Sequence, residues 1–221
     1  MKIQILTIFP GLCEAVLSES ILGRARRAGL VEAEAVDLRR WAKGRHRQTD
    51  DAPYGGGPGM VMMVEPIAVA LHELRAPETH VVLLSPHGVP FRQKSAERLA
   101  QKSHLIFVCG HYEGVDQRVA DHLVDEEVSI GDYVLTNGAL AALVLTDTIS
   151  RLLPGVLGDS GSALAESFTT GILDYPHYTR PASFQGWETP PVLLSGDHGA
   201  IANWRRKAAE RLTRERRPDL L

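Results

Sequence analysis

The chain has 221 residues, of which 44% are hydrophobic, and a formal net charge of −3 at pH 7. This composition supports a globular core, no apolar run approaches the length of a membrane span, and the first ten residues lack the features of a signal peptide. Cys13 and Cys109 match no disulfide framework and no CxxC site. We therefore expect reduced thiols, a cytoplasmic location and no membrane partner.

The hydrophobic pattern predicts strands that alternate with helices along the first two thirds of the chain. Strands are expected over 2–9, 31–37, 81–84 and 105–109, and helices over 12–22, 65–74, 95–102 and 138–153, with a turn at Pro10-Gly11. This order favours an α/β fold with a mostly parallel sheet. Ser160 to Ala165 are small and polar and suggest a hinge, and a smaller, mostly helical unit is expected from Phe168 onward.

In a parallel sheet, ligands bind beyond the carboxyl ends of the strands. Three segments are therefore candidate ligand loops: the one after Leu84, the one after Cys109, and the glycine-punctuated stretch 130–138. Together, the loops 110–116 and 130–138 could form a narrow pocket that grips a flat purine through backbone groups. The alternative for each loop is a tight turn without a ligand.

The segment 54–60, Tyr-Gly-Gly-Gly-Pro-Gly-Met, excludes a helix and a central strand. It leaves backbone N–H donors bare, which suits a phosphate or a base. It lacks the Gly-Lys-Ser/Thr ending of a P-loop and the preceding buried strand of a dinucleotide fingerprint. Five cations lie just upstream, so a nucleic acid is the favoured partner, against the alternative of a plain surface loop; they are Arg39, Arg40, Lys43, Arg45 and Arg47.

Charge is unevenly distributed in the rest of the chain. Seven cations and two acids lie within 204–217, whereas acids gather at 121–127. A basic segment of this kind indicates either a nucleic-acid surface or a solvated helix face. The run His177-Tyr178-Thr179-Arg180-Pro181 is aromatic and basic, as an RNA-contacting strip would be.

Three further residues are candidates for chemistry. Arg151 follows an apolar helix, where a cation either serves a site or complements the helix dipole. Glu166 and Asp174 flank an apolar and aromatic patch, where a carboxylate is either a general base or a helix cap. The spacing of His104, Cys109 and His111 fits no standard zinc pattern.

Several longer motifs together resemble one family, the bacterial tRNA (guanine-37 N1) methyltransferases known as TrmD. The resemblance runs from the first strand to the basic C-terminal helix. The motifs are Asp-Asp-Ala-Pro-Tyr-Gly-Gly-Gly-Pro-Gly-Met at 50–60, Cys-Gly-His-Tyr-Glu-Gly-Val-Asp at 109–116, Ser-Ile-Gly-Asp-Tyr-Val-Leu at 129–135, Pro-Gly-Val-Leu-Gly at 154–158, Tyr-Pro-His-Tyr-Thr-Arg-Pro at 175–181 and Pro-Val-Leu-Leu-Ser-Gly at 191–196.

The resemblance implies a SPOUT-type methyltransferase with a mostly parallel sheet and a deep trefoil knot. It also implies S-adenosylmethionine bound in the knot, a homodimer with the active site at the interface, and a tRNA with guanines at positions 36 and 37. The implied organisation is a knotted domain over 1–159, a flexible linker over 160–167 and a small helical tRNA-binding domain over 168–221.

The resemblance implies the cofactor-binding residues and the roles of Glu166, Arg151 and Glu113, whereas Asp174 and the tRNA-binding residues are proposed from their position and charge. Glu166 is assigned as the base that removes the proton from guanine N1, Arg151 as the cation that stabilises charge on O6, Asp174 as a second candidate base, and Glu113 as a possible magnesium neighbour. The tRNA-binding residues are Arg24, Arg45, His46, Arg47, Gly56, Gly57, Arg180 and Arg205. The cofactor-binding residues are Leu83, Leu84, Ser85, Pro86, Gly110, Tyr112, Glu113, Ile130, Gly131, Tyr133, Leu135, Asn137 and Gly138.

The sequence departs from the family pattern at two of these places. Glu166 stands where the family usually has Asp, and the loop after Leu135 reads Thr-Asn-Gly-Ala where Ser-Gly-Gly-Glu is common. Two other hypotheses remain open from the sequence: a related SPOUT enzyme that acts on another RNA base, and a non-catalytic RNA-binding module with the same fold.

Overall fold

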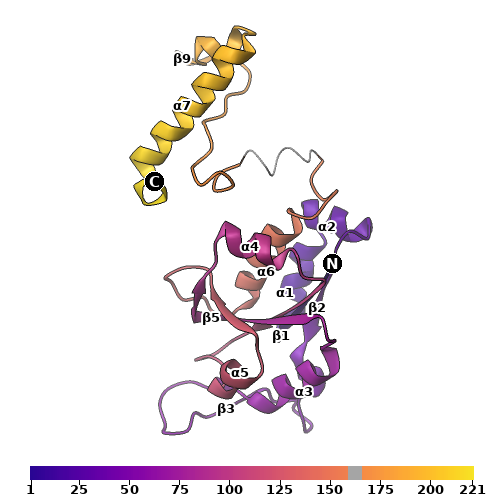
Figure 1. Cartoon of the computed structure of the whole chain (residues 1–221). Helices are drawn as coiled ribbons and strands as arrows, with labels where there is room; N and C mark the ends of the chain where they lie inside the picture. The colour runs from indigo at the N-terminus through magenta and orange to yellow at the C-terminus, as the bar shows by residue number, and fades with distance from the viewer. Residues whose placement is uncertain (159–165) are drawn as a thin grey trace. The chain divides into compact units, whose positions relative to one another are not determined.

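The computed structural model describes residues 1–158 and 166–221, which belong to two compact units, Met1–Gly158 and Asp159–Leu221. The first unit is built on a five-stranded sheet in the order β2-β1-β6-β5-β7, and every neighbouring pair in it is parallel (Figure 1). The α/β fold with a mostly parallel sheet is therefore confirmed. The strands are β1 (Lys2–Thr7), β2 (Glu32–Asp37), β5 (Thr79–Pro90), β6 (His104–Cys109) and β7 (Glu126–Ser129).

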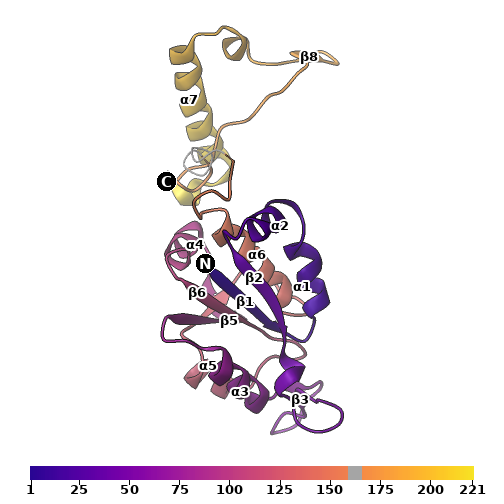
Figure 2. The same ribbon diagram turned by 90° about the vertical axis from the view of Figure 1, so that its right-hand side faces the viewer.

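Helices cover both faces of this sheet, as Figure 2 shows. One face packs against α1 (Pro10–Leu17), α2 (Ser20–Arg27), α4 (Gln93–Leu99) and α6 (Ala139–Ser150). The other packs against α3 (Val64–Leu74), α5 (Gln117–His122) and the short 3-10 helix η1 (Leu38–Trp41). Strands buried on both faces read as continuous apolar runs, which is why the sequence indicated them clearly.

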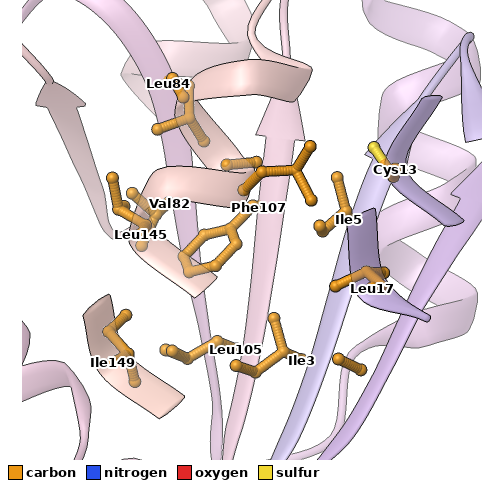
Figure 3. Close-up of a cluster of buried hydrophobic side chains, with 14 of the residues drawn as sticks. Ile3, Ile5, Cys13, Leu17, Val82, Leu84, Leu105, Phe107, Leu145 and Ile149 are labelled. Carbon is orange, nitrogen blue, oxygen red and sulfur yellow. The ribbon is translucent and has the colours of Figure 1, made fainter. Parts of the chain in front are cut away.

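Side-chain alternation divides each central strand between two cores. In β6, Leu105 and Phe107 join the core under α1 and α6, whereas Ile106 and Val108 join the core under α3. The first core is drawn in Figure 3, where Phe107 lies between side chains of the sheet and those of α6. Phe107 is fully buried.

The structure corrects the predicted element bounds in several places. The helix expected over 12–22 is two helices, because Glu19 is extended and Ser20 has φ +50°. Pro10-Gly11 does not turn the chain but starts α1, a position that suits proline because the first helical N–H has no partner within the helix. The helix expected to run to 153 ends at Ser150.

Two differences concern the sheet next to the candidate loops. The strand predicted to end at Leu84 continues to Pro90, with a register shift between Leu84 and Val89 where the strand bulges beside β7. Strand β7 was missed altogether, because Glu126 and Glu127 break its apolar pattern. Glu126 is accommodated by a hydrogen bond to His80 and an ion pair with Arg98.

A two-stranded hairpin, β3 (Asp50–Asp51) and β4 (Val61–Met62), completes the first unit and carries the glycine-rich loop between its arms. The second unit was expected to be mostly helical, and its described part also contains a second hairpin. Its elements are β8 (Ser183–Phe184), β9 (Trp187–Glu188), the 3-10 helix η3 (Pro191–Leu194), α7 (His198–Arg216) and the 3-10 helix η4 (Pro218–Leu220). The expected hinge at Ser160 to Ala165 lies outside the described residues.

Candidate cofactor pocket and RNA-binding surfaces

A cavity of about 240 Å³ lies at the carboxyl ends of β6 and β7 and beside residues 83–87 in the middle of β5. These strands are adjacent in the sheet, so the segments that line the cavity are neighbours in space. The structure brings together in this cavity all the residues that the resemblance assigned to the cofactor. They are Leu83, Leu84, Ser85, Pro86, Gly110, Tyr112, Glu113, Ile130, Gly131, Tyr133, Leu135, Asn137 and Gly138.

Hydrogen bonds between the second and third loops hold the cavity wall together. The N–H of Gly138 donates to the carbonyl oxygen of Gly110 at 2.8 Å. The Nδ1 of His111 lies 2.8 Å from the carbonyl oxygen of Thr136, and His111 and Asn137 form an isolated antiparallel bridge. The two loops therefore form one backbone-lined wall.

Glycines in this wall allow approaches that side chains would block. A Cβ on Gly138 would lie 3.0 Å from Cys109 Cα and from the Gly110 nitrogen. Gly131 has φ +148°, and a Cβ there would lie 2.5 Å from the Tyr133 ring. The Tyr133 hydroxyl in turn donates to the Ile130 carbonyl oxygen at 3.1 Å, so the third loop folds back on itself.

The glycine-rich hairpin is attached to the second loop. The N–H of Glu113 donates to the Met60 carbonyl oxygen at 3.0 Å, and the N–H of Met62 donates to Gly114 at 2.9 Å. Burial, together with the Asp50 carboxylate of β3, raises the pKa of Tyr112. The hairpin that carries the predicted RNA loop thus borders the cavity wall.

The glycine-rich loop itself is exposed. Gly55, Gly56, Gly57 and Gly59 all have positive φ, and Tyr54 is completely exposed. A Cβ on Gly59 would collide with the Glu113 carboxylate. The loop therefore needs glycine for its backbone conformation, whereas a side chain at position 59 would also require the exposed Glu113 side chain to move.

The predicted RNA-binding residues of the first unit fall into two groups. Arg45, His46 and Arg47 are exposed just before β3, on the side of the glycine-rich loop. Arg24 is exposed on α2, which packs against the opposite face of the sheet (Figure 1). The structure therefore does not join Arg24 to the other cations on one surface of this unit.

Among the candidates for chemistry, Arg151 caps the C-terminal end of α6 in the first unit, and Glu166 and Asp174 belong to the second. The Asp174 carboxylate accepts the N–H of Tyr175 at 2.7 Å and lies 2.9 Å from His177 Nε2. Its own N–H donates to Ser167 Oγ at 2.9 Å. Asp174 is therefore held by local contacts within its unit.

A second cavity, of about 370 Å³, lies in the second unit against α7. Tyr175, His177, Arg180 and Arg205 are among its lining residues, so the two predicted RNA-binding arginines of this unit meet here. The Arg205 guanidinium lies over the Tyr175 ring, 4.8 Å from its centroid.

The comparisons with known proteins cover the whole chain. The family described as "tRNA (Guanine-1)-methyltransferase TrmD" matches residues 1–221. This chain belongs to the TrmD family. Relatives named tRNA (guanine-N(1)-)-methyltransferase include proteins of Brevibacillus brevis, 53% identical over 100% of this chain and 91% of the relative, and of Protochlamydia amoebophila, 53% identical over 100% of both chains. The protein of Geobacillus kaustophilus is 50% identical over 100% of this chain and 91% of its own length.

Sequence reasoning missed some residues of the cavity in this TrmD family member. His111 and Thr136 tie two loops together, and Ser129 bonds with Gly131 at 3.2 Å through its hydroxyl. His87, Gln117 and Val134 also line the cavity. His111, Ser129, Thr136 and Val134 lie in or directly beside the segments already singled out, but contacts through backbone atoms leave no residue-type signal.

No helix in the described ranges is long and apolar enough to cross a membrane. The same ranges contain no cluster of three or more His, Cys, Asp or Glu side chains that could hold a metal ion.

Proposed function

We propose that this TrmD family member transfers a methyl group from S-adenosylmethionine to N1 of the guanine at position 37 of tRNA, next to the anticodon. The observation that carries the proposal is the match over all 221 residues to a family and to relatives whose names state tRNA (guanine-N1) methylation. The cavity beyond β6 and β7 and beside β5 gives the donor a binding place of the expected kind.

The cavity fits the donor in its chemistry. Leu84, Ile130 and Leu135 supply apolar surface for a flat purine ring, and the absence of side chains at Gly110 and Gly138 lets a ligand approach the backbone closely. When bound, S-adenosylmethionine supplies a methyl group on a sulfonium. The three loops would hold and orient it, and orientation is the main contribution that a protein makes to an in-line displacement.

Guanine must lose the proton on N1 before that nitrogen becomes a good nucleophile. We assign the proton transfer to the Glu166 carboxylate and the stabilisation of negative charge on O6 to the Arg151 guanidinium. Glu166 is one methylene longer than the aspartate usual in the family. Asp174 is the second candidate for the base, since its carboxylate is fixed by Tyr175 and His177.

Magnesium remains a prediction. Glu113 is an exposed carboxylate at the cavity, and magnesium often takes only one or two carboxylates from a protein. The described residues offer no cluster of metal ligands around Glu113. The proposed reaction therefore includes no step that requires magnesium.

A homodimer forms part of the proposal, with a stripe on α1 and α6 as its support. Leu12 and Val16 on α1, and Leu140 and Val144 on α6, are each between 40% and 46% exposed. The two helices pack against each other, and the four side chains occur as i,i+4 pairs, so they form one apolar stripe. Such a stripe suits contact with a second copy of the chain.

The remaining parts of the proposal concern the roles of the domains and the cellular location of the protein. We assign cofactor binding to a knotted domain over 1–159, tRNA binding to 168–221 and a linker role to 160–167. Both cysteines are buried free thiols, which is compatible with a cytoplasmic enzyme.

Two substitutions test the assigned chemistry. In Arg151→Ala and Glu166→Gln we expect the affinity for S-adenosylmethionine to stay within about 2-fold of wild type. We expect the single-turnover rate to fall by at least about 100-fold. Calorimetry and transfer of a labelled methyl group measure the two quantities. Asp174→Asn is the matched variant: if it loses turnover while Glu166→Gln keeps it, the base assignment is wrong.

A further inference from the structure

The hairpin β8–β9 carries two aromatic side chains that do not belong to a core. Phe184 is 55% exposed and Trp187 is 70% exposed. They are directly paired across the strands, and their ring centroids are 5.9 Å apart. Exposing two large aromatic rings side by side is unfavourable in water unless a partner covers them.

The backbone fixes how the pair is presented. Gln185 and Gly186, the two turn residues, both have positive φ, as a tight two-residue hairpin requires. The N–H of Thr189 donates to the Ala182 carbonyl oxygen at 2.8 Å and closes the hairpin behind the pair. Phe184 and Trp187 therefore lie on one face of a short, well-defined ribbon.

That face continues into the second cavity. Side chains two residues apart on a strand point to the same side, so Phe184 shares a face with Ala182, and Trp187 shares one with Thr189. Ala182 and Thr189 both line the second cavity. The aromatic pair is thus the outer extension of the cavity wall.

The cavity contributes positive charge without neutralising partners. Arg180 and Arg205 line it and are exposed. Within residues 1–158 and 166–221, neither guanidinium forms an ion pair with a carboxylate. Unpaired guanidinium groups at a concave surface favour an anionic ligand.

Aromatic rings beside unpaired arginines match the chemistry of an unpaired nucleotide: a flat base and a phosphate. We propose that the hairpin stacks one unpaired base of the tRNA on Trp187 and Phe184, while Arg180 and Arg205 contact the adjoining phosphates. This inference rests on the proposed function for its RNA, and it adds a contact nucleotide distinct from the guanine that is methylated.

The first test separates stacking from a general apolar effect. Trp187→Leu keeps an apolar side chain but removes the ring, and we expect it to weaken tRNA binding about 10-fold. Trp187→Phe should restore most of the affinity. Leu221→Ala, which alters an equally exposed apolar residue of the same unit, should leave binding unchanged.

The second test separates stacking from phosphate contact. The logarithm of the tRNA dissociation constant is measured against the logarithm of salt concentration. Trp187→Leu should shift the line without changing its slope, and Arg205→Ala should reduce the slope by about 1.

The results also separate this inference from the proposed function. If the wild-type protein methylates tRNA and Trp187→Leu binds tRNA as tightly as wild type, the hairpin contact is wrong and the enzyme assignment stands. If Trp187→Leu instead changes the oligomeric state in sedimentation with unchanged tRNA affinity, the hairpin binds protein and the inference is overturned. If wild type neither binds nor methylates tRNA, the proposed function fails first.

Discussion

Gly138, at the end of the third cavity loop, lies close to the backbone of the second loop. A Cβ there would be 3.0 Å from two backbone atoms, Cys109 Cα and the Gly110 nitrogen, neither of which is the mobile end of a side chain. The carbonyl oxygen of Gly110 also accepts the Gly138 N–H. A methyl group at this position therefore requires the backbone at Cys109 and Gly110 to move by a few tenths of an ångström.

We predict that Gly138→Ala lowers the free energy of unfolding by about 1–3 kcal/mol, the usual cost of an overpacked site, and weakens S-adenosylmethionine binding. Urea denaturation and calorimetry measure the two effects. Gly11→Ala is the control, because Gly11 lies in α1 with no atom near its Cβ position and alanine favours a helix. If Gly138→Ala and Gly11→Ala had the same unfolding free energy and the same S-adenosylmethionine affinity, the close approach of Gly138 to the second loop would be contradicted.

The residues of the cavity show what residue types reveal and what they hide. Gly110, Gly131 and Gly138 were visible in the sequence because glycine marks turns and close approaches. The pairing of His111 with the Thr136 carbonyl oxygen was not visible, because any residue provides that acceptor. Glu126 and Glu127 concealed strand β7, since the partners of Glu126, His80 and Arg98, are distant in the sequence.

At the scale of elements, a chain of polar contacts crosses the amino ends of the central strands. His104 of β6 is only 5% exposed, and its Nδ1 lies 2.7 Å from Thr79 Oγ1 of β5. Its Nε2 lies 2.9 Å from Gln4 Oε1 of β1, and Gln4 Nε2 donates to Glu34 of β2 at 2.6 Å. Four adjacent strands are thus linked through the His104 imidazole.

Burial is the main reason that the pKa of His104 is lowered, and the Lys2 charge adds to it. A lowered folded-state pKa means that the unfolded chain takes up the proton first as the pH falls. The contribution of His104 to stability is therefore complete above about pH 6.5, the unfolded value, and declines as the pH drops below it.

We predict that between pH 7.5 and pH 5 the wild-type protein loses more unfolding free energy than His104→Gln does. Urea unfolding at pH 7.5 and at pH 5 measures this difference. Comparing wild type with His104→Gln cancels the contributions of other titratable groups. His72→Gln, at an exposed site on α3, should behave as wild type. An identical pH dependence in His104→Gln would refute the role of this imidazole.

Element types were more predictable than element bounds. Buried strands such as β6 stood out because both of their faces are covered. The extension of β5 to Pro90 was not predictable, because Ser85, Pro86 and Gly88 read as an exit loop. Gly88 is required there by packing: a Cβ would collide with the Val128 backbone.

For the whole molecule, the apolar stripe on α1 and α6 gives the proposed dimer a direct test. We predict that Val144→Glu dissociates the dimer into monomers, because a charge would have to be buried in an apolar contact. Sedimentation velocity measures the change, and methyl transfer should fall with it if the active site lies at the interface.

The control for the dimer test is Val69→Glu on α3. Val69 is 43% exposed, as Val144 is 46% exposed, but α3 covers the opposite face of the sheet. Val69→Glu should remain dimeric. A wild-type protein that is monomeric at micromolar concentration would contradict the proposal without any variant.

At this scale the sequence pattern gives the layer order but neither a knot nor an interface. Hydrophobic periodicity assigns helices and strands, whereas threading of the chain depends on connections that leave no periodic signal. The long motifs at 50–60 and 109–116 indicated the family. The expectation of a knot and a dimer rests on that family resemblance.

The central claim is methyl transfer to N1 of guanine 37. The most direct measurement is transfer from labelled S-adenosylmethionine to a tRNA transcript with guanines at positions 36 and 37, beside a transcript with adenine at 37. We predict transfer to the first transcript alone. Transfer to both would contradict the assigned target nucleotide, and transfer to neither, with the cofactor still bound, would contradict the assigned activity.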